Sequence, residues 1–214
     1  MKRLRRRYEP QKIRYFMCGE YGEQLMRPHY HALLFGFDFQ DRQLWTTREG
    51  INVDTSAQLE SLWPKGFSTV GEVTWQTAAY TSRYCLKKIT GKDADEHYLK
   101  CDLSTGELIS ITPEYNAMSL RPAIGRTWFE KYRSDCYPKD FITHEGKKFR
   151  VPRYYDKLLE ADDPTRLDQL KLQRRQKAWQ WESEQTKERL RSREQCALAR
   201  TKRLIRPIER TRPC

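Results

Sequence analysis

The chain has 214 residues, of which 37% are hydrophobic and 33% charged, and its mean hydropathy is −0.94. No apolar run approaches the roughly 18 residues that a membrane-spanning helix needs, which excludes an integral membrane protein. Lys and Arg number 41 against 29 Asp and Glu, so the net charge is +12, and nucleic acid is the first candidate for an anionic partner.

The first predicted elements lead into a hairpin. The basic residues 1–8 are typical of the last turn of a helix, and no apolar segment follows them as it would in a secretory signal. Residues 13–18 and 29–37 each have the pattern of a strand, with a polar turn over 19–28. We therefore expect an antiparallel hairpin with a long loop.

A second group of elements follows the hairpin. A short strand is expected over 67–70, after the turn at Lys65-Gly66. Thr74 is a suitable N-cap for a helix from Trp75 to about Ile89, because its hydroxyl oxygen can accept a hydrogen bond from a free first-turn amide. Residues 91–159 are mixed in composition and carry turn signals, with a short helix expected over 127–133.

Asp163 and Pro164 predict the start of a long C-terminal helix, since Asp suits the cap and Pro the first helical position. Residues 165–206 contain no Gly or Pro and are expected to form one helix. From Pro164 onward there are fifteen basic and six acidic residues, so this tail carries most of the surplus charge. Its apolar positions are sparse, and we expect it to bury little in a shared core and to contact DNA non-specifically.

The six cysteines are scattered singly, with no CxxC pair. This pattern indicates neither a zinc knuckle nor a disulfide framework, and it fits a reducing cytoplasm best. The six are Cys18, Cys85, Cys101, Cys136, Cys196 and Cys214.

His29-Tyr30-His31 lies in the second strand of the hairpin. Residues two apart on a strand share a face, so both imidazoles project into one space while Tyr30 faces away. Two neutral imidazoles favour a divalent metal, although two satisfied polar side chains in a strand would give the same triplet. An antiparallel hairpin brings Glu20 near both histidines, whereas a solvated turn residue is the alternative for Glu20 and for Glu23.

The expected helix carries Tyr80, Tyr84, Lys87 and Lys88 on one face, because positions i, i+4, i+7 and i+8 align. Core packing is the usual role of such a tyrosine stripe. A face that runs from two phenols into two ammonium groups is poorly suited to burial and well suited to a phosphate backbone, with a phenol placed to attack one phosphate.

Three motifs together resemble the replication initiators of gokushovirus-like Microviridae, which are rolling-circle HUH endonucleases (His, hydrophobic residue, His). The motifs are Gly19-Glu-Tyr-Gly22, Arg27-Pro-His-Tyr-His31 and Tyr80-xxx-Tyr84-xx-Lys87-Lys88. The resemblance covers about residues 13–159 and includes the stretches 113–125, 128–132 and 152–156.

The resemblance implies an α+β fold, with an antiparallel-sheet HUH-endonuclease (Rep-like) domain over residues 1–160 and a long basic C-terminal helix over 161–214. It also implies a site that binds Mg²⁺ or Mn²⁺. The metal ligands would be His29, His31 and Glu20. The nucleophiles would be Tyr80 and Tyr84, with Lys87 or Lys88 contacting phosphate, and the DNA-binding residues would be Arg27, Arg83, Lys87 and Lys88.

The implied reaction nicks single-stranded or origin DNA and leaves a 5′-phosphotyrosine and a free 3′-OH. The implied partners are single-stranded DNA, the replication origin and the host replication machinery, in the host bacterial cytoplasm and with no membrane. The alternative is a non-catalytic, basic single-stranded nucleic-acid-binding protein, in which the tyrosines stack bases and the histidines are structural.

The family also has an N-terminal section in which a sheet strand with its own motif precedes a helix. Met1 falls where the end of that helix would lie. We therefore expect the chain to be truncated at its N-terminus, to lack this strand and to expose a sheet edge.

Overall fold

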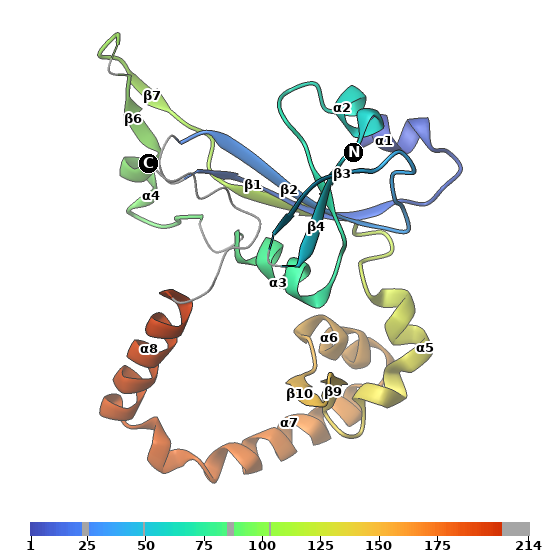
Figure 1. The fold of residues 1–214 in the computed structure, drawn as a ribbon. Coiled ribbons are helices and arrows are strands. Elements are labelled where there is room, and N and C mark those ends of the chain that lie inside the picture. Colours follow the sequence, from blue (N-terminus) through green and yellow to red (C-terminus); the bar gives the residue numbers. More distant parts are fainter. Residues whose placement is uncertain (23–25, 49, 85–87, 103, 203–214) are drawn as a thin grey trace. The chain divides into compact units, whose positions relative to one another are not determined.

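The computed structural model describes residues 1–22, 26–48, 50–84, 88–102 and 104–202. Helices and small antiparallel sheets make up these residues, which confirms the α+β class (Figure 1). The chain divides into two compact units, Met1–Ile124 and the described part of Gly125–Ile205. The predicted boundary near residue 160 is therefore wrong, because the segment from Gly125 onward packs with the helix that follows Asp163.

The first unit contains two three-stranded sheets, one two-stranded sheet and four helices in its described residues. In chain order its elements are α1 (Lys2–Arg7), β1 (Arg14–Tyr21), β2 (Pro28–Phe35), β3 (Gln43–Arg48), β4 (Ile51–Thr55), α2 (Ala57–Leu62), β5 (Val70–Gly71), α3 (Trp75–Arg83), α4 (Ala94–Tyr98), β6 (Leu99–Cys101), β7 (Leu108–Ser110) and β8 (Tyr115–Met118).

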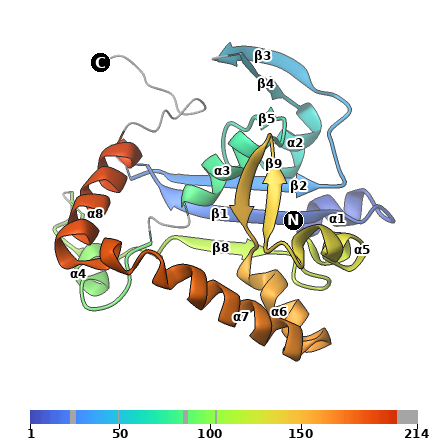
Figure 2. The same cartoon turned by 90° about the horizontal axis from the view of Figure 1, so that it is seen from below.

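The sheet that matters for function has the strand order β2-β1-β8, and Figure 2 shows the three strands side by side. The predicted hairpin is confirmed, because β1 and β2 pair antiparallel over their whole length. β8 pairs with the other side of β1, with Gly19 opposite Tyr115. In the described part of the chain, β2 and β8 are thus the outer strands and β1 is central.

Helix α3 lies against one face of this sheet, where the Cys18 thiol donates to the carbonyl of Thr81 over 3.7 Å. The predicted cap is confirmed, since the Thr74 hydroxyl accepts from the Thr77 N–H and the Thr77 hydroxyl accepts from the Thr74 N–H. This capping box satisfies two amides at the start of the helix. The helix ends at Arg83 with Tyr84 as its C-cap, earlier than the expected end near Ile89.

The second three-stranded sheet has the order β3-β4-β5. The predicted strand over 67–70 is present only as β5, and β3 and β4 were not predicted. The buried residues Leu4, Ile13 and Phe39 form an apolar core in this unit, together with partly buried side chains from α2 and β5.

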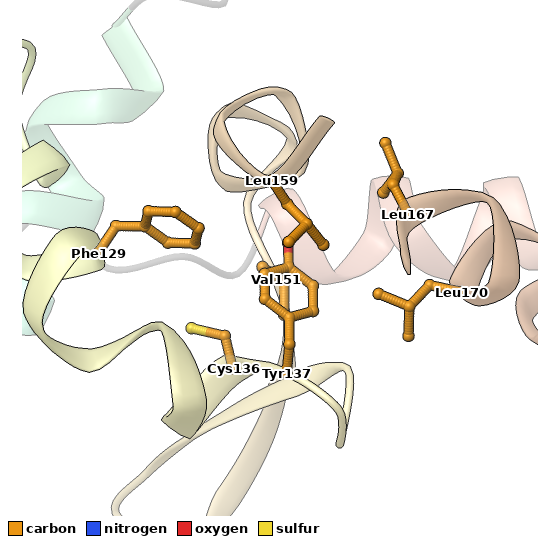
Figure 3. Packing of buried hydrophobic residues seen from close by; sticks show 7 residues of the cluster. All are labelled: Phe129, Cys136, Tyr137, Val151, Leu159, Leu167 and Leu170. Atoms are coloured by element: carbon orange, nitrogen blue, oxygen red, sulfur yellow. The ribbon is translucent and has the colours of Figure 1, made fainter. Parts of the chain in front are cut away.

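The second unit has its own apolar core, shown in Figure 3. Leu167 and Leu170 lie in this core with exposed fractions of 2% and 0%, so the expectation that the tail buries little is wrong for its first turns. The elements are α5 (Arg126–Cys136), β9 (Phe141–His144), β10 (Lys147–Arg150), α6 (Arg153–Asp162), α7 (Pro164–Trp179), the 3₁₀ helix η2 (Glu182–Gln185) and α8 (Lys187–Lys202). The core residues are Phe129, Cys136, Tyr137, Val151, Leu159, Leu167 and Leu170.

The predicted start of the C-terminal helix is confirmed, because the Asp163 side chain accepts from the Arg166 N–H and Pro164 is the first helical residue. The expectation of one continuous helix is wrong. α7 ends at Trp179, and α8 begins after Thr186, whose hydroxyl accepts from the Arg189 N–H. A hydroxyl that competes for a backbone amide favours a new helix start over continuation of the old one.

Among the described residues, Cys18, Cys101, Cys136 and Cys196 are free thiols. The helices of this part of the chain include none that is long and apolar enough to cross a membrane.

Candidate active site

A carboxylate and an imidazole meet on the face of the sheet that α3 covers. Glu20 lies directly opposite His29 in the strand pairing, and Cys18 lies opposite His31. Opposed residues share a face and so do alternate residues, so these four side chains belong to one face. Glu20 is 5% exposed, and its Oε1 lies 3.0 Å from Nε2 of His31. The hairpin thus brings Glu20 and His31 into contact, as expected.

His29 has a different environment from His31. Its side chain is exposed, and its ring lies against the backbone of Gly22, where an added Cβ would be 2.8 Å from Cε1 of His29. Gly22 also closes the hairpin loop, since its N–H donates to the carbonyl of Arg27 over 3.0 Å. The position of the His29 ring therefore depends on the absence of a side chain at residue 22.

The predicted metal ligands fit a divalent cation in kind, because carboxylates and imidazoles both bind ions such as Mn²⁺. In position, the structure gathers two of the three. Within the part of the chain that the structure describes, no three His, Cys, Asp or Glu side chains converge on one metal-sized space. Glu20 and His31 form the contact pair, and His29 lies on the same face with its ring turned toward Gly22.

Tyr80 and Tyr84 meet beside this pair. The Tyr84 hydroxyl donates to the hydroxyl oxygen of Tyr80. The Tyr84 ring stacks on the His31 imidazole, with centroids 4.2 Å apart and planes 10° apart, and the Tyr80 ring meets His31 edge-on at 6.0 Å. The spacing of one helical turn thus places both phenols next to the Glu20–His31 pair.

Both tyrosine rings are buried, with exposed fractions of 5% for Tyr80 and 4% for Tyr84, and they form a small cluster with Cys18. The core-packing interpretation therefore describes their rings correctly. It does not account for the two hydroxyls, which lie together next to an imidazole and a carboxylate.

The other predicted site residues are less closely placed. Lys88 is exposed, and Lys87 and Glu23 lie outside the described residues. Arg27 is exposed just before β2, and Arg83 is half-buried at the last position of α3. Their predicted contacts with DNA stay predictions.

Two residues on the same face were missed by the sequence reasoning. Cys18 lies between His31 on β2 and Asn116 on β8, so that the three form one row across the sheet. Alternation along β1 could have found Cys18, which is two residues before Glu20. Asn116 had no such signal, because nothing in the local sequence shows that β8 pairs with β1.

A buried hydrogen-bond chain holds the segment that follows the tyrosines. The Tyr98 hydroxyl accepts from the Ile89 N–H over 3.0 Å and donates to the Glu114 carboxylate over 2.5 Å. Tyr98 and Glu114 are 5% and 7% exposed. Burial raises the pKa of Tyr98, and the Glu114 carboxylate raises it further, so the phenol stays protonated and fixes the backbone next to Lys88.

Comparison with known proteins agrees with the motifs. The sequence model of the replication-associated protein ORF2 family matches residues 1–89, which include Glu20, His29, His31, Tyr80 and Tyr84. Replication-associated protein ORF2 of Spiroplasma virus 4 is 33% identical over 169 residues, which are 76% of this chain and 48% of that protein. No solved structure matches the chain.

Two further phage proteins are similar. Replication-associated protein VP4 of Bdellovibrio phage phiMH2K is 33% identical over 70% of this chain and 44% of its own length. Replication-associated protein ORF4 of Chlamydia phage 1 is 28% identical over 74% of this chain and 39% of its own length. The chain thus spans less than half the length of these relatives. With its motifs in the same order, it belongs to the replication-associated protein ORF2 family of microvirus-type phages.

Proposed function

We propose that the chain is a rolling-circle replication initiator with an HUH-endonuclease domain, which nicks single-stranded or origin DNA by transfer of a phosphodiester to tyrosine. One observation supports this most. Two distant motifs of the sequence meet at one point, where the Glu20–His31 pair of the hairpin touches the paired hydroxyls of α3.

Each residue has a defined task in this proposal. Glu20, His31 and His29 would hold Mg²⁺ or Mn²⁺, which when bound draws negative charge from the scissile phosphodiester. The oxygen of Tyr80 or Tyr84 is the nucleophile. The Tyr84 hydroxyl donates to the Tyr80 oxygen, and such a donor also stabilises the negative charge that forms when the phenol loses its proton.

The transfer balances without any nucleotide hydrolysis. The bond from the tyrosine oxygen to phosphorus forms as the bond from phosphorus to the 3′ oxygen breaks. The phenol gives up its proton and the departing 3′ oxygen gains one, which leaves a 5′-phosphotyrosine and a free 3′-OH. The second tyrosine serves a later cleavage and rejoining, and Lys87 or Lys88 contacts phosphate.

The alternative is a non-catalytic single-stranded nucleic-acid-binding protein whose tyrosines stack bases. Base stacking needs an open ring face. The Tyr84 ring is already stacked on His31, and both rings are at most 5% exposed. Catalysis needs only the hydroxyl oxygen to reach phosphorus, so the geometry favours the nicking proposal over stacking by Tyr80 and Tyr84.

The proposed partners follow from the reaction. They are single-stranded DNA and the replication origin, with the host replication machinery needed to extend the free 3′-OH. Arg27, Arg83, Lys87 and Lys88 would contact the DNA. The proposed place of action is the cytoplasm of the host bacterium.

The test is a covalent band. The full chain is incubated with Mn²⁺ and a pool of random-sequence single-stranded DNA, then separated on a denaturing gel. Tyr80→Phe combined with Tyr84→Phe should eliminate the band, while each single variant keeps part of it or fails at rejoining. His31→Ala should abolish metal-dependent cleavage and spare most DNA binding. Tyr137→Phe, which alters a tyrosine of the second unit, is the matched control and should keep the band.

Two results would contradict the proposal. One is a covalent band of normal strength in the double tyrosine variant. The other is full nicking by His31→Ala, or by the unaltered chain in EDTA.

A further inference from the structure

Two tryptophans are exposed where the C-terminal helices break. Trp179 is the last residue of α7, and Trp181 follows the capping residue Gln180. Their exposed fractions are 70% and 63%. The Trp181 N–H donates to the carbonyl of Ala178 over 3.0 Å, so the backbone that carries the indoles is ordered by a turn. Large exposed aromatic surfaces of this kind mark binding sites more often than isolated aliphatic side chains do.

The helix that follows contributes nothing to a core. Every residue of α8 whose side chain is described is exposed, including Leu190 and Leu198 at 46% and 57%. A helix that is exposed on all sides gains no stability from packing and is suited to a partner or to solvent. α8 contains six basic residues and only two acidic ones, Glu188 and Glu194.

Most cations around the break are available to a partner. Arg174 and Lys171 are already ion-paired within the second unit, and Arg189 is paired with Glu184. A second set makes no ion pair with any residue that the structure describes. This set is Arg175, Lys177, Lys187, Arg191, Arg193 and Arg200.

We propose that residues 175–200, here termed the tail surface, hold single-stranded DNA. The indoles of Trp179 and Trp181 stack on unpaired bases, and the six cations contact phosphates. Stacking on an indole requires bases that are not already stacked in a duplex, which selects single strands. A second copy of the chain is disfavoured as the occupant, because its own tail surface carries the same positive charge. The choice of DNA over another polyanion rests on the proposed function.

The test measures binding without cleavage. Fluorescence anisotropy follows a labelled oligo(dT) of about 20 nucleotides with the full chain in EDTA, at several salt concentrations. Trp179→Ala with Trp181→Ala should weaken binding at least about tenfold and leave the salt dependence unchanged, whereas Phe at both positions should retain most of the affinity. Leu190→Ala with Leu198→Ala is the matched control and should bind normally.

The cations are tested separately. Arg191→Gln with Arg193→Gln should lower the slope of log affinity against log salt by about 1.4, since each phosphate contact on a single strand contributes about 0.7. Because EDTA prevents nicking, failure of this inference leaves the covalent band unaffected, and failure of the proposed function leaves these affinities unaffected.

Several outcomes would overturn the inference. They are unchanged binding by the double Trp→Ala variant, an equal loss in the leucine control, an equal loss on duplex DNA of the same length, and binding to anionic lipid vesicles with no binding to oligo(dT).

Discussion

At the scale of single residues, two glycines shape the hairpin that carries the candidate site. Gly19 lies under aromatic rings on the face opposite the site, where an added Cβ would be 2.7 Å from the Tyr115 ring and 3.3 Å from the Tyr30 ring. Gly22 lies under the His29 ring on the site face. Both belong to the Gly19-Glu-Tyr-Gly22 motif, so close approach of side chains to the strand explains why this motif begins and ends with glycine.

Gly22→Ala should therefore act on His29 rather than on the fold. Gly22 does not have the left-handed backbone that strains other residues, so the free energy of unfolding should change by less than about 0.5 kcal/mol. The His29 ring must move, and Mn²⁺-dependent nicking should fall about tenfold, as when the support of a metal ligand is lost. Thermal unfolding and an Mn²⁺ titration of nicking measure the two effects.

Gly71→Ala is the control, because an added Cβ there meets only Asn52 at an ordinary 3.9 Å. If Gly22→Ala nicks like the unaltered chain while His29→Ala is impaired, the packing of His29 against Gly22 has no functional role.

At the scale of elements, Arg174 of α7 joins two other parts of the second unit. Its guanidinium donates to Asp140, which precedes β9, and to Asp156 of α6, with distances of 2.5 to 3.0 Å. The Tyr137 hydroxyl donates to Asp156 over 2.6 Å. Burial tends to raise the pKa of Asp156, but the hydrogen bonds from Arg174 and Tyr137 outweigh it, so the pKa is lowered overall.

Arg174→Met should lower the free energy of unfolding by about 3 kcal/mol near neutral pH, because two partly buried carboxylates lose their partner. The stabilisation from Asp156 is present above its unfolded pKa of about 3.9 and is lost as the pH falls through its lower folded pKa. The difference between variant and unaltered chain should therefore shrink in acid. Urea unfolding between neutral and acid pH measures it.

Arg175→Met, at an exposed position on the same helix, should leave stability unchanged. Equal stability of the Arg174→Met variant, or a difference that does not shrink in acid, would show that the network contributes little.

Local signals predicted the local elements. The Thr74 cap, the Asp163-Pro164 start and the strand alternation around His29 each act within a few residues, so a single sequence reveals them. The same alternation, combined with the hairpin, predicted the Glu20–His31 contact. Features set by distant pairing were not predictable, such as the place of Asn116 beside Cys18 about a hundred residues away. The burial of Leu167 and Leu170 was missed because two apolar positions give no sustained period.

At the scale of the whole molecule, the C-terminal helices have separate roles. α7 completes the core of the second unit, whereas α8 is exposed throughout its described side chains. A chain that ends at Thr186 should keep the unfolding free energy within about 0.5 kcal/mol. A chain that ends at Asp163 loses Leu167, Leu170 and Arg174, and since each buried leucine contributes about 2–5 kcal/mol, its second unit should unfold.

Urea unfolding and limited proteolysis of the two shortened chains distinguish these expectations. Equal stability of the two would mean that the boundary lies near residue 160 after all, with α7 acting as part of a separate tail.

The central claim is that Tyr80 and Tyr84 form the covalent link to DNA, and the chain itself offers a direct measurement. Arg83 separates the two tyrosines, so trypsin releases Tyr80 within residues 66–83 and Tyr84 within residues 84–87. After reaction with Mn²⁺ and single-stranded DNA, nuclease digestion and mass spectrometry should find a nucleotide 5′-phosphate on one or both of these peptides. A nucleotide attached to any other residue, or a band that carries a label from the 5′ end of the DNA instead of the 3′ end, would contradict the account.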